Sequence, residues 1–411
     1  MNYTSHSMNK YKSFSWLTGL LIVALTSLLI ACSSTSAGSS TTAPTPATTT
    51  QSTGSGTTAN SSAATTSANG GSKGVILPTL PLTHIRMLDA THGWALDSNN
   101  VLKTSDGGQS WVALTPAGAA LNPAVNAEFL NALYAWVIVP NIQAGTVTVF
   151  RTSTGGASWQ SSIIHESTAD GALVTFINKQ VGLLELSPNG AGAGSQGIDI
   201  FQTIDGGVTW NKIATTGDGK SGLPNGGIKS GLSFRDAMNG WATGEDASNT
   251  PWLYATHNGG RNWSKQALSG RSLDANAMYQ LTPPVLFGNN GLLPVSFSGA
   301  SATQFVLYVT HDGGKTWTNN GQAVAPFNGS NAYALDTRFV WATDSQKGDF
   351  YQTRNGGQSW QKIASNPGVN GELSFVDITT GFAIGYADQT VLKRTIDGGH
   401  TWQTIKYQIH G

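Results

Sequence analysis

The segment nearest the C-terminus shows the hydrophobic pattern of the chain most clearly. Short runs rich in apolar and β-branched residues cover 372–376, 381–386, 390–395 and 401–407, and turn residues that include a Gly-Gly pair separate them. Runs of this length, bounded by Gly, Asp and Thr, predict four short antiparallel strands joined by tight turns.

The same pattern recurs along the chain and has a fixed apolar position in the second predicted strand. The residues in that position are Trp94, Trp136, Leu183, Trp241, Leu292, Trp341 and Phe382. In six of the seven units an Asp or Asn stands five residues earlier, where its side chain can cap the first turn. These capping residues are Asp89, Asn131, Asn178, Asp236, Asp336 and Asp377. The fifth unit departs from the pattern, with Phe287 in the capping position.

One eight-residue phrase, Thr-x-(Asp/Asn)-Gly-Gly-x-(Ser/Thr)-Trp, marks every unit. Its seven copies end at Trp111, Trp159, Trp210, Trp263, Trp317, Trp360 and Trp402. The intervals of 48, 51, 53, 54, 43 and 42 residues match the length of a four-stranded propeller blade with variable loops. We therefore expect an all-β fold over residues 75–411, namely a seven-bladed β-propeller of four-stranded antiparallel blades.

Each part of this phrase has a mechanical interpretation. The Gly pair supplies positive φ where the third strand turns into the fourth, and the preceding side chain can accept backbone N–H bonds. The preceding residues are Asp106, Thr154, Asp205, Asn258, Asp312, Asn355 and Asp397. The initial Thr can tie the hairpin, and the final Trp can bury its ring between blades. A set of metal- or substrate-binding carboxylates is disfavoured because Thr and Asn replace Asp in some copies. Thr154 in the second unit, and Asn262 in place of Ser or Thr in the fourth, predict that these two turns are the weakest.

The N-terminal residues are typical of a targeting segment. Lys10 and Lys12 precede an apolar stretch, residues 14–31, which ends in Leu-Ile-Ala directly before the only cysteine, Cys32. Residues 1–32 resemble a bacterial lipoprotein signal peptide, in which this cysteine is acylated and becomes the mature N-terminus. An uncleaved membrane anchor with an incidental cysteine is the alternative. We expect the protein to be held at the membrane of a bacterial cell envelope by its lipid anchor, with the propeller outside the cytoplasm.

Residues 33–74 differ sharply in composition from the rest of the chain. They consist largely of Ser, Thr, Ala and Gly, and their lack of large apolar residues predicts a disordered linker. Without the two lysines of the signal, the chain has 20 basic and 22 acidic residues, so nucleic acid is excluded as a partner. The eight histidines form no ligand pattern, and no phosphate-binding loop or dinucleotide motif is present. We expect no metal and no cofactor.

The phrase ending in Trp resembles the Asp-box, or bacterial neuraminidase (BNR), repeat. The longer pattern is clearest where Phe234-Arg235-Asp236 leads to Gly240-Trp241-Ala242, and it is similar to the photosystem II stability and assembly factor group. That resemblance implies an extracytoplasmic module without catalysis that binds another envelope or membrane protein. Asp boxes also occur in sialidases and other glycosidases, so a glycan-binding protein or glycoside hydrolase remains the alternative.

Ligands usually bind propellers on the face opposite the boxes, which carries the loops between second and third strands and the links between blades. The candidate residues on that face are Glu245, Asp246, Arg271, Asp274, Asp344 and Asp349. The same face also carries Glu166, Asp170, Asp218 and Asp388, and a glycosidase would need two such acids across one sugar. A sialidase is disfavoured because the family resemblance implies three substrate-binding arginines, whereas only Arg271 and Arg86 could reach this face.

Overall fold

The computed structural model describes residues 64–67, 74–169, 171–246, 249–272, 276–298, 303–325, 327–386 and 390–411. These residues form strands, turns and irregular loops without any helix, so the prediction of an all-β fold is confirmed. No helix capable of crossing a bilayer therefore occurs among them. Cys32 and Asp274, for which the sequence predicts lipidation and ligand binding, lie outside the described residues.

Six of the seven sequence repeats form four sequential antiparallel strands each. The first repeat comprises β3 (His84–Met87), β4 (Gly93–Leu96), β5 (Val101–Thr104) and β6 (Ser110–Ala113). The second comprises β7 (Asn126–Phe129), β8 (Ala135–Asn141), β9 (Thr146–Thr152) and β10 (Ser158–Ile164). The third comprises β11 (Ala172–Phe176), β12 (Gly182–Leu186), β15 (Asp199–Thr203) and β16 (Asn211–Thr215). Between β12 and β15 a small hairpin, β13 (Ala191–Gly192) and β14 (Ser195–Gln196), is inserted.

The later repeats follow the same order. The fourth comprises β17 (Ile228–Phe234), β18 (Gly240–Glu245), β19 (Trp252–Thr256) and β20 (Ser264–Lys265). The sixth comprises β25 (Gly329–Ala334), β26 (Val340–Asp344), β27 (Phe350–Thr353) and β28 (Gln361–Ala364). The seventh comprises β29 (Leu373–Phe375), β30 (Gly381–Tyr386), β31 (Thr390–Thr395) and β32 (Gln403–Ile405). The second and third strands of the seventh repeat have the bounds that the sequence predicts.

The fifth repeat is irregular where its sequence departs from the pattern. Its first strand is divided into β21 (Met278–Leu281) and β22 (Val285–Phe287), which both pair with β23 (Asn290–Ser298). Two prolines, Pro283 and Pro284, separate the halves, and proline has no N–H to donate to the sheet. The third strand is β24 (Thr303–Thr310), and one pair, Glu245 with Gln280, joins this repeat to the sheet of the fourth.

Segments from both ends of the described chain add to the outer edge of the first two repeats. The C-terminal strand β33 (Gln408–His410) pairs in parallel with β6, and β2 (Ile76–Leu77) pairs with β33. Strand β1 (Ala64–Ser67) pairs with β10. These additions cover two sheet edges that would otherwise expose unpaired backbone groups.

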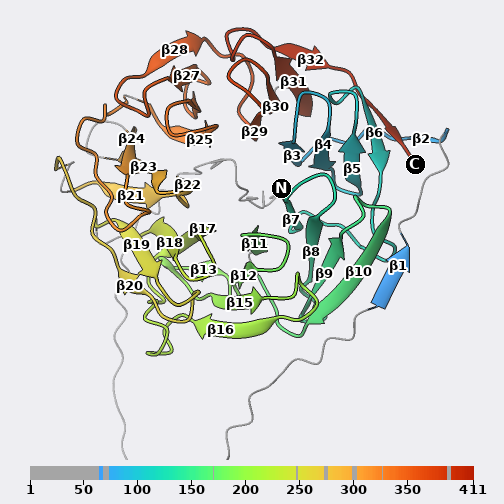
Figure 1. The fold of residues 1–411 in the computed structure, drawn as a ribbon, viewed down its shortest axis with the longest axis horizontal. Helices are drawn as coiled ribbons and strands as arrows, with labels where there is room; N and C mark the ends of the chain where they lie inside the picture. The colour runs from blue at the N-terminus through green and yellow to red at the C-terminus, as the bar shows by residue number, and fades with distance from the viewer. Residues whose placement is uncertain are drawn as a thin grey trace, which may run out of the picture. The chain divides into compact units, whose positions relative to one another are not determined.

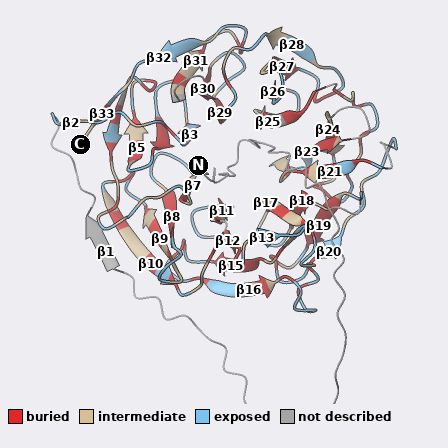
Figure 2. Cartoon of the chain, turned by 180° about the vertical axis from the view of Figure 1, so that it is seen from behind, coloured by how far each residue is buried: buried red, intermediate tan, exposed pale blue. Residues whose placement is uncertain are grey.

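The sheets lie around a common centre, with the first strand of each repeat innermost (Figure 1). Hydrophobic cores of the described residues form between consecutive repeats rather than within them. A further core joins the seventh repeat to the first, because Phe382, Ile384 and Leu392 pack with Ile85, Leu102 and Trp111. Buried residues follow the inner strands, whereas exposed residues gather on outer strands such as β16 and β32 (Figure 2).

Candidate functional site

The first box shows how this turn is held. The hydroxyl of Thr104 donates to Asp106 Oδ1 (2.9 Å) and accepts the N–H of Gly108 (3.0 Å). The carboxylate of Asp106 then accepts the N–H of Ser110 (2.9 Å) and the hydroxyl of Ser110 (2.5 Å). The Thr and Asp side chains together satisfy the donors of a turn that has no ladder partner, which is the task of an Asx-type turn.

Boxes without Asp make equivalent bonds. Thr154 accepts the N–H of Ser158 through its hydroxyl at 2.9 Å. Asn258 accepts the N–H of Asn262 at 2.9 Å and donates its own amide to Asn262 Oδ1 at 2.8 Å. Asn355 likewise accepts the N–H of Ser359 at 3.0 Å and donates its side-chain amide to the hydroxyl of Ser359 at 2.9 Å. The turn therefore needs an acceptor oxygen at this position rather than a negative charge.

The carbonyl of the first box glycine bonds to the preceding repeat at five of the junctions. We call this contact a junction bond. The donors and acceptors are Lys103 Nζ to Gly155 (3.1 Å), Trp136 Nε1 to Gly206 (2.8 Å), Gln202 Nε2 to Gly259 (3.3 Å), Arg235 Nη1 to Gly313 (3.0 Å) and Trp341 Nε1 to Gly398 (2.8 Å). The boxes thus lie where neighbouring repeats meet. The acceptor is the first glycine carbonyl at all five junctions, whereas the donor is a Lys, Trp, Gln or Arg side chain.

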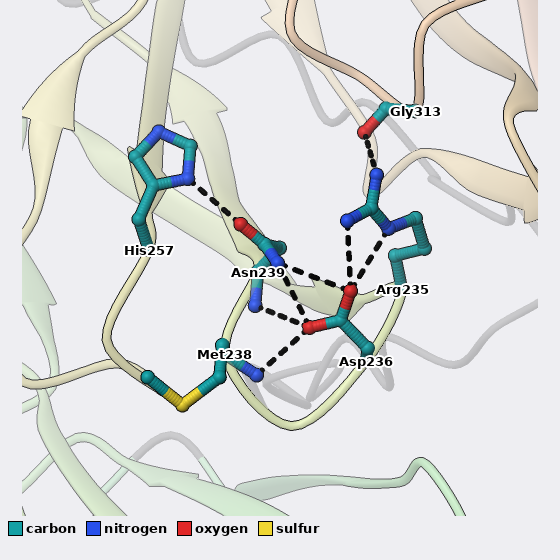
Figure 3. A network of polar contacts seen from close by, with 6 residues as sticks. All are labelled: Arg235, Asp236, Met238, Asn239, His257 and Gly313. Atoms are coloured by element: carbon teal, nitrogen blue, oxygen red, sulfur yellow. Dashed lines mark hydrogen bonds and ion pairs between the residues drawn. The ribbon is translucent and has the colours of Figure 1, made fainter.

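Figure 3 shows the junction bond of Arg235 together with the capping turn of its own repeat. Asp236 Oδ1 accepts the N–H groups of Met238 and Asn239, both at 2.9 Å, as predicted for a capping residue. The guanidinium of Arg235 pairs with Asp236 Oδ2 (2.9 and 2.8 Å) and reaches Gly313 in the next repeat. Both charged groups, Arg235 and Asp236, are thus engaged within the capping turn and the neighbouring box.

Most box tryptophans are buried, and four of their indole N–H groups have an acceptor. Trp111, Trp159, Trp210, Trp263 and Trp317 are buried, whereas Trp360 and Trp402 are half-buried. Trp111, Trp263 and Trp402 donate to the second glycine carbonyl of their own box, and Trp159 donates to Leu114. The indole nitrogens of Trp210, Trp317 and Trp360 have no acceptor within the described residues.

Of the predicted binding-face acids, Glu245 and Asp246 lie at the end of β18. Glu245 Oε2 accepts the side-chain amide of Gln280 at 3.1 Å. Asp246 lies near two titratable groups. Burial lowers the pKa of Lys229 to about 8, although the negative charges of Glu185 and Asp246 act to raise it. Burial, followed by the charge of Asp246, raises the pKa of Tyr254.

Lys229 is buried and anchors a loop. Its Nζ donates to the carbonyl oxygens of Asn225 (2.8 Å), Gly226 (3.0 Å) and Gly227 (3.0 Å), and it lies 5.1 Å from the ring centroid of Trp252. Three carbonyl acceptors replace the water that burial removes from the ammonium group. The lysine therefore fixes the loop that precedes β17.

The other predicted residues lie in separate places. Arg271 Nη2 donates to the carbonyl of Gln322 at 3.3 Å, in the fifth repeat. In the sixth repeat, Asp344 is buried and accepts the N–H of Gln346 at 3.0 Å, while Asp349 pairs with Lys362 at 3.3 Å. The structure thus distributes the predicted residues over three repeats, and none of them lines the large cavity at the centre of the described fold.

That cavity has a volume of about 1040 Å³ and is lined by the first strands of all seven repeats. Its wall combines apolar side chains, such as Leu130, Leu286 and Leu335, with a comparable share of polar ones. The polar side chains include His84, Arg86, Glu128, Tyr333 and Glu372. A cavity in which polar groups converge between apolar side chains is a usual form of a small-molecule site.

The pair formed by His84 and Glu372 is the most ordered polar feature of the cavity wall. His84 Nδ1 lies 2.6 Å from Glu372 Oε2, and both side chains are buried. The same oxygen accepts the N–H of Ile85 at 2.8 Å, so Glu372 of the last repeat is held against β3 of the first. The imidazole of His84 also stacks on Phe129, with ring centroids 5.5 Å apart.

Two further polar groups meet across a neighbouring part of the wall. Arg86 Nη1 contacts the hydroxyl of Tyr333 at 3.3 Å, and that hydroxyl donates to the carbonyl of Phe375 at 2.8 Å. Arg86 is exposed on β3, while Glu128 is half-buried on β7. The cavity wall therefore carries the carboxylates of Asp89, Glu128 and Glu372, one exposed guanidinium and a phenol.

Loop-based sorting of the sequence missed Glu128, Glu372 and His84. The sequence places ligand binding in loops opposite the boxes, whereas these three residues lie on or beside first strands. A signal was present, because Glu128 places a charge between the buried Ala127 and Phe129 of a first strand, in a chain with few charges. Within the described ranges, no group of three or more His, Cys, Asp or Glu side chains could hold a metal ion.

Comparison with known proteins finds one match to a sequence repeat and several solved structures of low similarity. The BNR/Asp-box repeat model matches residues 308–319. No curated protein matches the chain in sequence.

The similar solved structures cover most of the chain at low identity. A GH74 xyloglucanase from Xanthomonas campestris is 13% identical, covering 84% of this chain and 56% of its own, with a TM-score of 0.48. A PL25 ulvan lyase is 10% identical, covering 68% and 81%, with a TM-score of 0.47. A Penicillium chrysogenum α-L-arabinanase is 14% identical, covering 70% and 92%, with a TM-score of 0.39. The chain spans little more than half the length of the xyloglucanase.

The predicted function, a non-catalytic assembly module similar to the photosystem II group, is wrong. The family match is to the Asp-box repeat alone, the three structures named above are of enzymes that act on glycans, and nothing links the chain to a photosystem factor. The same findings overturn the prediction that the chain is not an enzyme. The box describes a turn and not a site, so it carries no information on function. At 10–14% identity these structures say nothing about the reaction that this chain performs. Any inference about its chemistry has to come from its own residues.

Proposed function

We propose that residues 75–411 form one seven-bladed propeller whose ring is closed between the seventh and first repeats. The support is the core in which Phe382 and Leu392 pack with Trp111, together with the bond from Ile85 to Glu372. Parallel pairing of β33 with β6 adds a backbone connection at the same junction. A ring of this kind makes the central cavity a single compartment.

We propose further that this compartment is the active site of a glycoside hydrolase. The observation that carries the proposal is the presence of two glutamates, Glu128 and Glu372, on the wall of one cavity of about 1040 Å³. Hydrolysis of a glycosidic bond requires a pair of carboxyl groups, one to donate a proton and one to attack or to activate water. The volume suits an oligosaccharide, and the apolar side chains of the wall offer faces for sugar rings.

The surroundings of the two glutamates suit different roles. Glu372 is fixed by His84 and by the N–H of Ile85, an arrangement that suits the carboxylate that attacks or activates water. Glu128 then serves as the proton donor. Arg86 and Tyr333, in contact at 3.3 Å, are placed to bind sugar hydroxyls. The described wall carries a single arginine, so it does not form the three-arginine clamp of a sialidase.

Activity assays on a panel of aryl glycosides and plant or algal polysaccharides test this function. Glu372→Gln and Glu128→Gln should each lower kcat by at least about a hundredfold, because each removes one of two required groups. Glu245→Gln is the matched control, since Glu245 lies outside the cavity wall. Equal activity in all three variants, or an absence of turnover across the panel, contradicts the proposal.

For location we propose that Cys32 carries lipid and that the linker over residues 33–74 tethers the propeller to the outside of a membrane. The support is the apolar stretch that ends in Leu29-Ile30-Ala31 before the cysteine. A tethered hydrolase of this kind would meet glycans at the surface of the cell.

A further inference from the structure

A second, smaller pocket lies at the junction of the second and third repeats, near the box turns. Its volume is about 280 Å³, and its wall includes Tyr134, Arg151, Gln160, Lys179 and Asp205. Lys179 is exposed, with its Nζ 5.8 Å from the ring centroid of Tyr134. None of these residues takes part in the central cavity.

Arg151 occupies this pocket without an acceptor. Its side chain is half-buried, its Nε is buried, and its guanidinium donates no hydrogen bond within the described part of the chain. Burial lowers the pKa of Arg151, and the negative charge of Asp205 opposes that shift. Guanidinium groups removed from water normally have acceptors, because an unmatched buried donor is costly.

In the neighbouring repeats, the residue at the position equivalent to Arg151 does have an acceptor. Lys103 in the first repeat donates to the carbonyls of Ala132 and Gly155, and Gln202 in the third donates to Gly259. In the second repeat the corresponding glycine carbonyl, that of Gly206, already accepts the indole N–H of Trp136 at 2.8 Å. Arg151 therefore occupies the position of a junction donor, but within the described residues its Nε donates to no carbonyl.

The nearest carboxylate is also occupied. Asp205 Oδ1 accepts the hydroxyl of Thr203 (2.8 Å) and the N–H groups of Val208 and Thr209, both at 3.0 Å. Asp205 Oδ2 accepts the hydroxyl of Thr209 at 2.6 Å. A carboxylate engaged in this way inside its own turn offers no open edge for bidentate pairing with an arginine.

We propose that this pocket binds a tetrahedral oxyanion, a phosphate or sulfate group, between Arg151 and Lys179. The guanidinium presents several donors in a fixed fork, the ammonium adds a second positive charge, and Gln160 and Ser158 supply neutral donors on the same wall. The group can belong to a free ion or to an ester on a polymer. The site is independent of the proposed hydrolase activity.

Calorimetric titration of the full-length protein tests the site, with inorganic phosphate and inorganic sulfate as the first probes. Dextran sulfate and unsubstituted dextran form a second, matched pair that distinguishes a polymer ester from a free ion. We expect saturable binding of at least one anionic probe and none of dextran. Tighter binding of dextran sulfate than of the ions identifies an ester as the natural ligand, and ion binding alone identifies a free anion.

Arg151→Gln should weaken binding by at least about tenfold, equivalent to ~1.4 kcal/mol. Glutamine is native at the equivalent position of the third repeat, Gln202, so the fold should tolerate it. Arg394→Gln is the matched control, because Arg394 also has a buried Nε without an acceptor but lies outside this pocket. The proposal is overturned by wild-type protein that shows no saturable binding, or by equal binding in Arg151→Gln and wild type while both remain folded.

Discussion

The indole N–H of Trp341 donates to the carbonyl oxygen of Gly398 at 2.8 Å, across the junction between the sixth and seventh repeats. Trp136 and Gly206 stand in the same relation, also at 2.8 Å, between the second and third. A residue that is conspicuous in the second strand of one repeat is thus bonded to the box of the next. The two most regular positions in the sequence form one contact between repeats.

Trp341→Phe should destabilise the protein through this contact. Phenylalanine keeps most of the buried ring but leaves the Gly398 carbonyl without its donor, which costs about 1–3 kcal/mol. Trp210→Phe is the control, because the buried indole nitrogen of Trp210 has no acceptor among the described residues. Urea unfolding of both variants gives the comparison, and equal losses of stability show that the junction bond contributes nothing.

Gly314→Ala should be more harmful than Gly321→Ala. Both glycines have positive φ, +82° and +79°, so both substitutions incur the backbone cost of about 1–2 kcal/mol. A Cβ on Gly314 would lie 2.0 Å from Cζ2 of the buried Trp241, whereas a Cβ on Gly321 meets nothing within 4 Å. The overlap should add roughly 1–3 kcal/mol. Thermal unfolding measures the difference, and matching melting temperatures rule out a tight contact at this junction.

Acid should weaken the box turns that contain Asp. Burial raises the pKa values of Asp312 and Asp397, but hydrogen bonds from Thr316 and Thr401 respectively outweigh it and lower each pKa to about 2. A lowered pKa contributes stability above the unfolded value of 3.8, and that contribution is lost as the pH falls through 2.

The double variant Asp312→Asn, Asp397→Asn tests this directly. Asn already holds the turns at Asn258 and Asn355, so the variant should fold. Its free energy of unfolding should depend less steeply on pH between about 4 and 2 than that of the wild type. Identical slopes in acid unfolding titrations show that these carboxylates are not responsible.

Lys229 should produce a second rise of stability with pH, this time in alkali. Its pKa is lowered to about 8 in the fold, so below pH 8 both states are protonated and the full cost of burying the charge is present. Between about pH 8 and 10.4 the unfolded state binds more protons, and the free energy of unfolding should rise with pH, by on the order of 1–3 kcal/mol.

Lys229→Met should remove this rise, whereas Lys406→Met, at an exposed position, should retain it. Denaturant unfolding at a series of pH values provides the measurement. A rise of equal size in Lys229→Met assigns the dependence to other groups.

Cys32→Ala should abolish membrane attachment. The substitution removes the thiol that lipidation requires, so the protein should be released or should remain an unprocessed precursor. Fractionation and intact mass provide the readout, and Ser33→Ala is a neighbouring control. Unchanged fractionation and mass in Cys32→Ala contradict the lipoprotein interpretation.

The amino-acid sequence determined the repeat, its strands and its turns. Gly-Gly pairs, the Asp or Asn before them and short β-branched runs act locally, so β30 and β31 have the bounds that the sequence predicts. The division of the fifth repeat follows equally from local chemistry, because Pro283 and Pro284 cannot donate to a ladder. Local steric and hydrogen-bonding rules are sufficient for these features.

Only the tertiary structure decided which side chains meet. Glu372 and His84 are separated by most of the propeller sequence and come within 2.6 Å because the last repeat packs against the first. The acids at Glu245, Asp344 and Asp349 look suited to ligand binding in sequence, yet none of them lies on the wall of the central cavity. At the junction beside Arg151, the packing of the repeats brings the indole of Trp136, and not the arginine, to the carbonyl of Gly206. Such contacts depend on the packing of one repeat on another, and a single repeat carries no information about its neighbour's orientation.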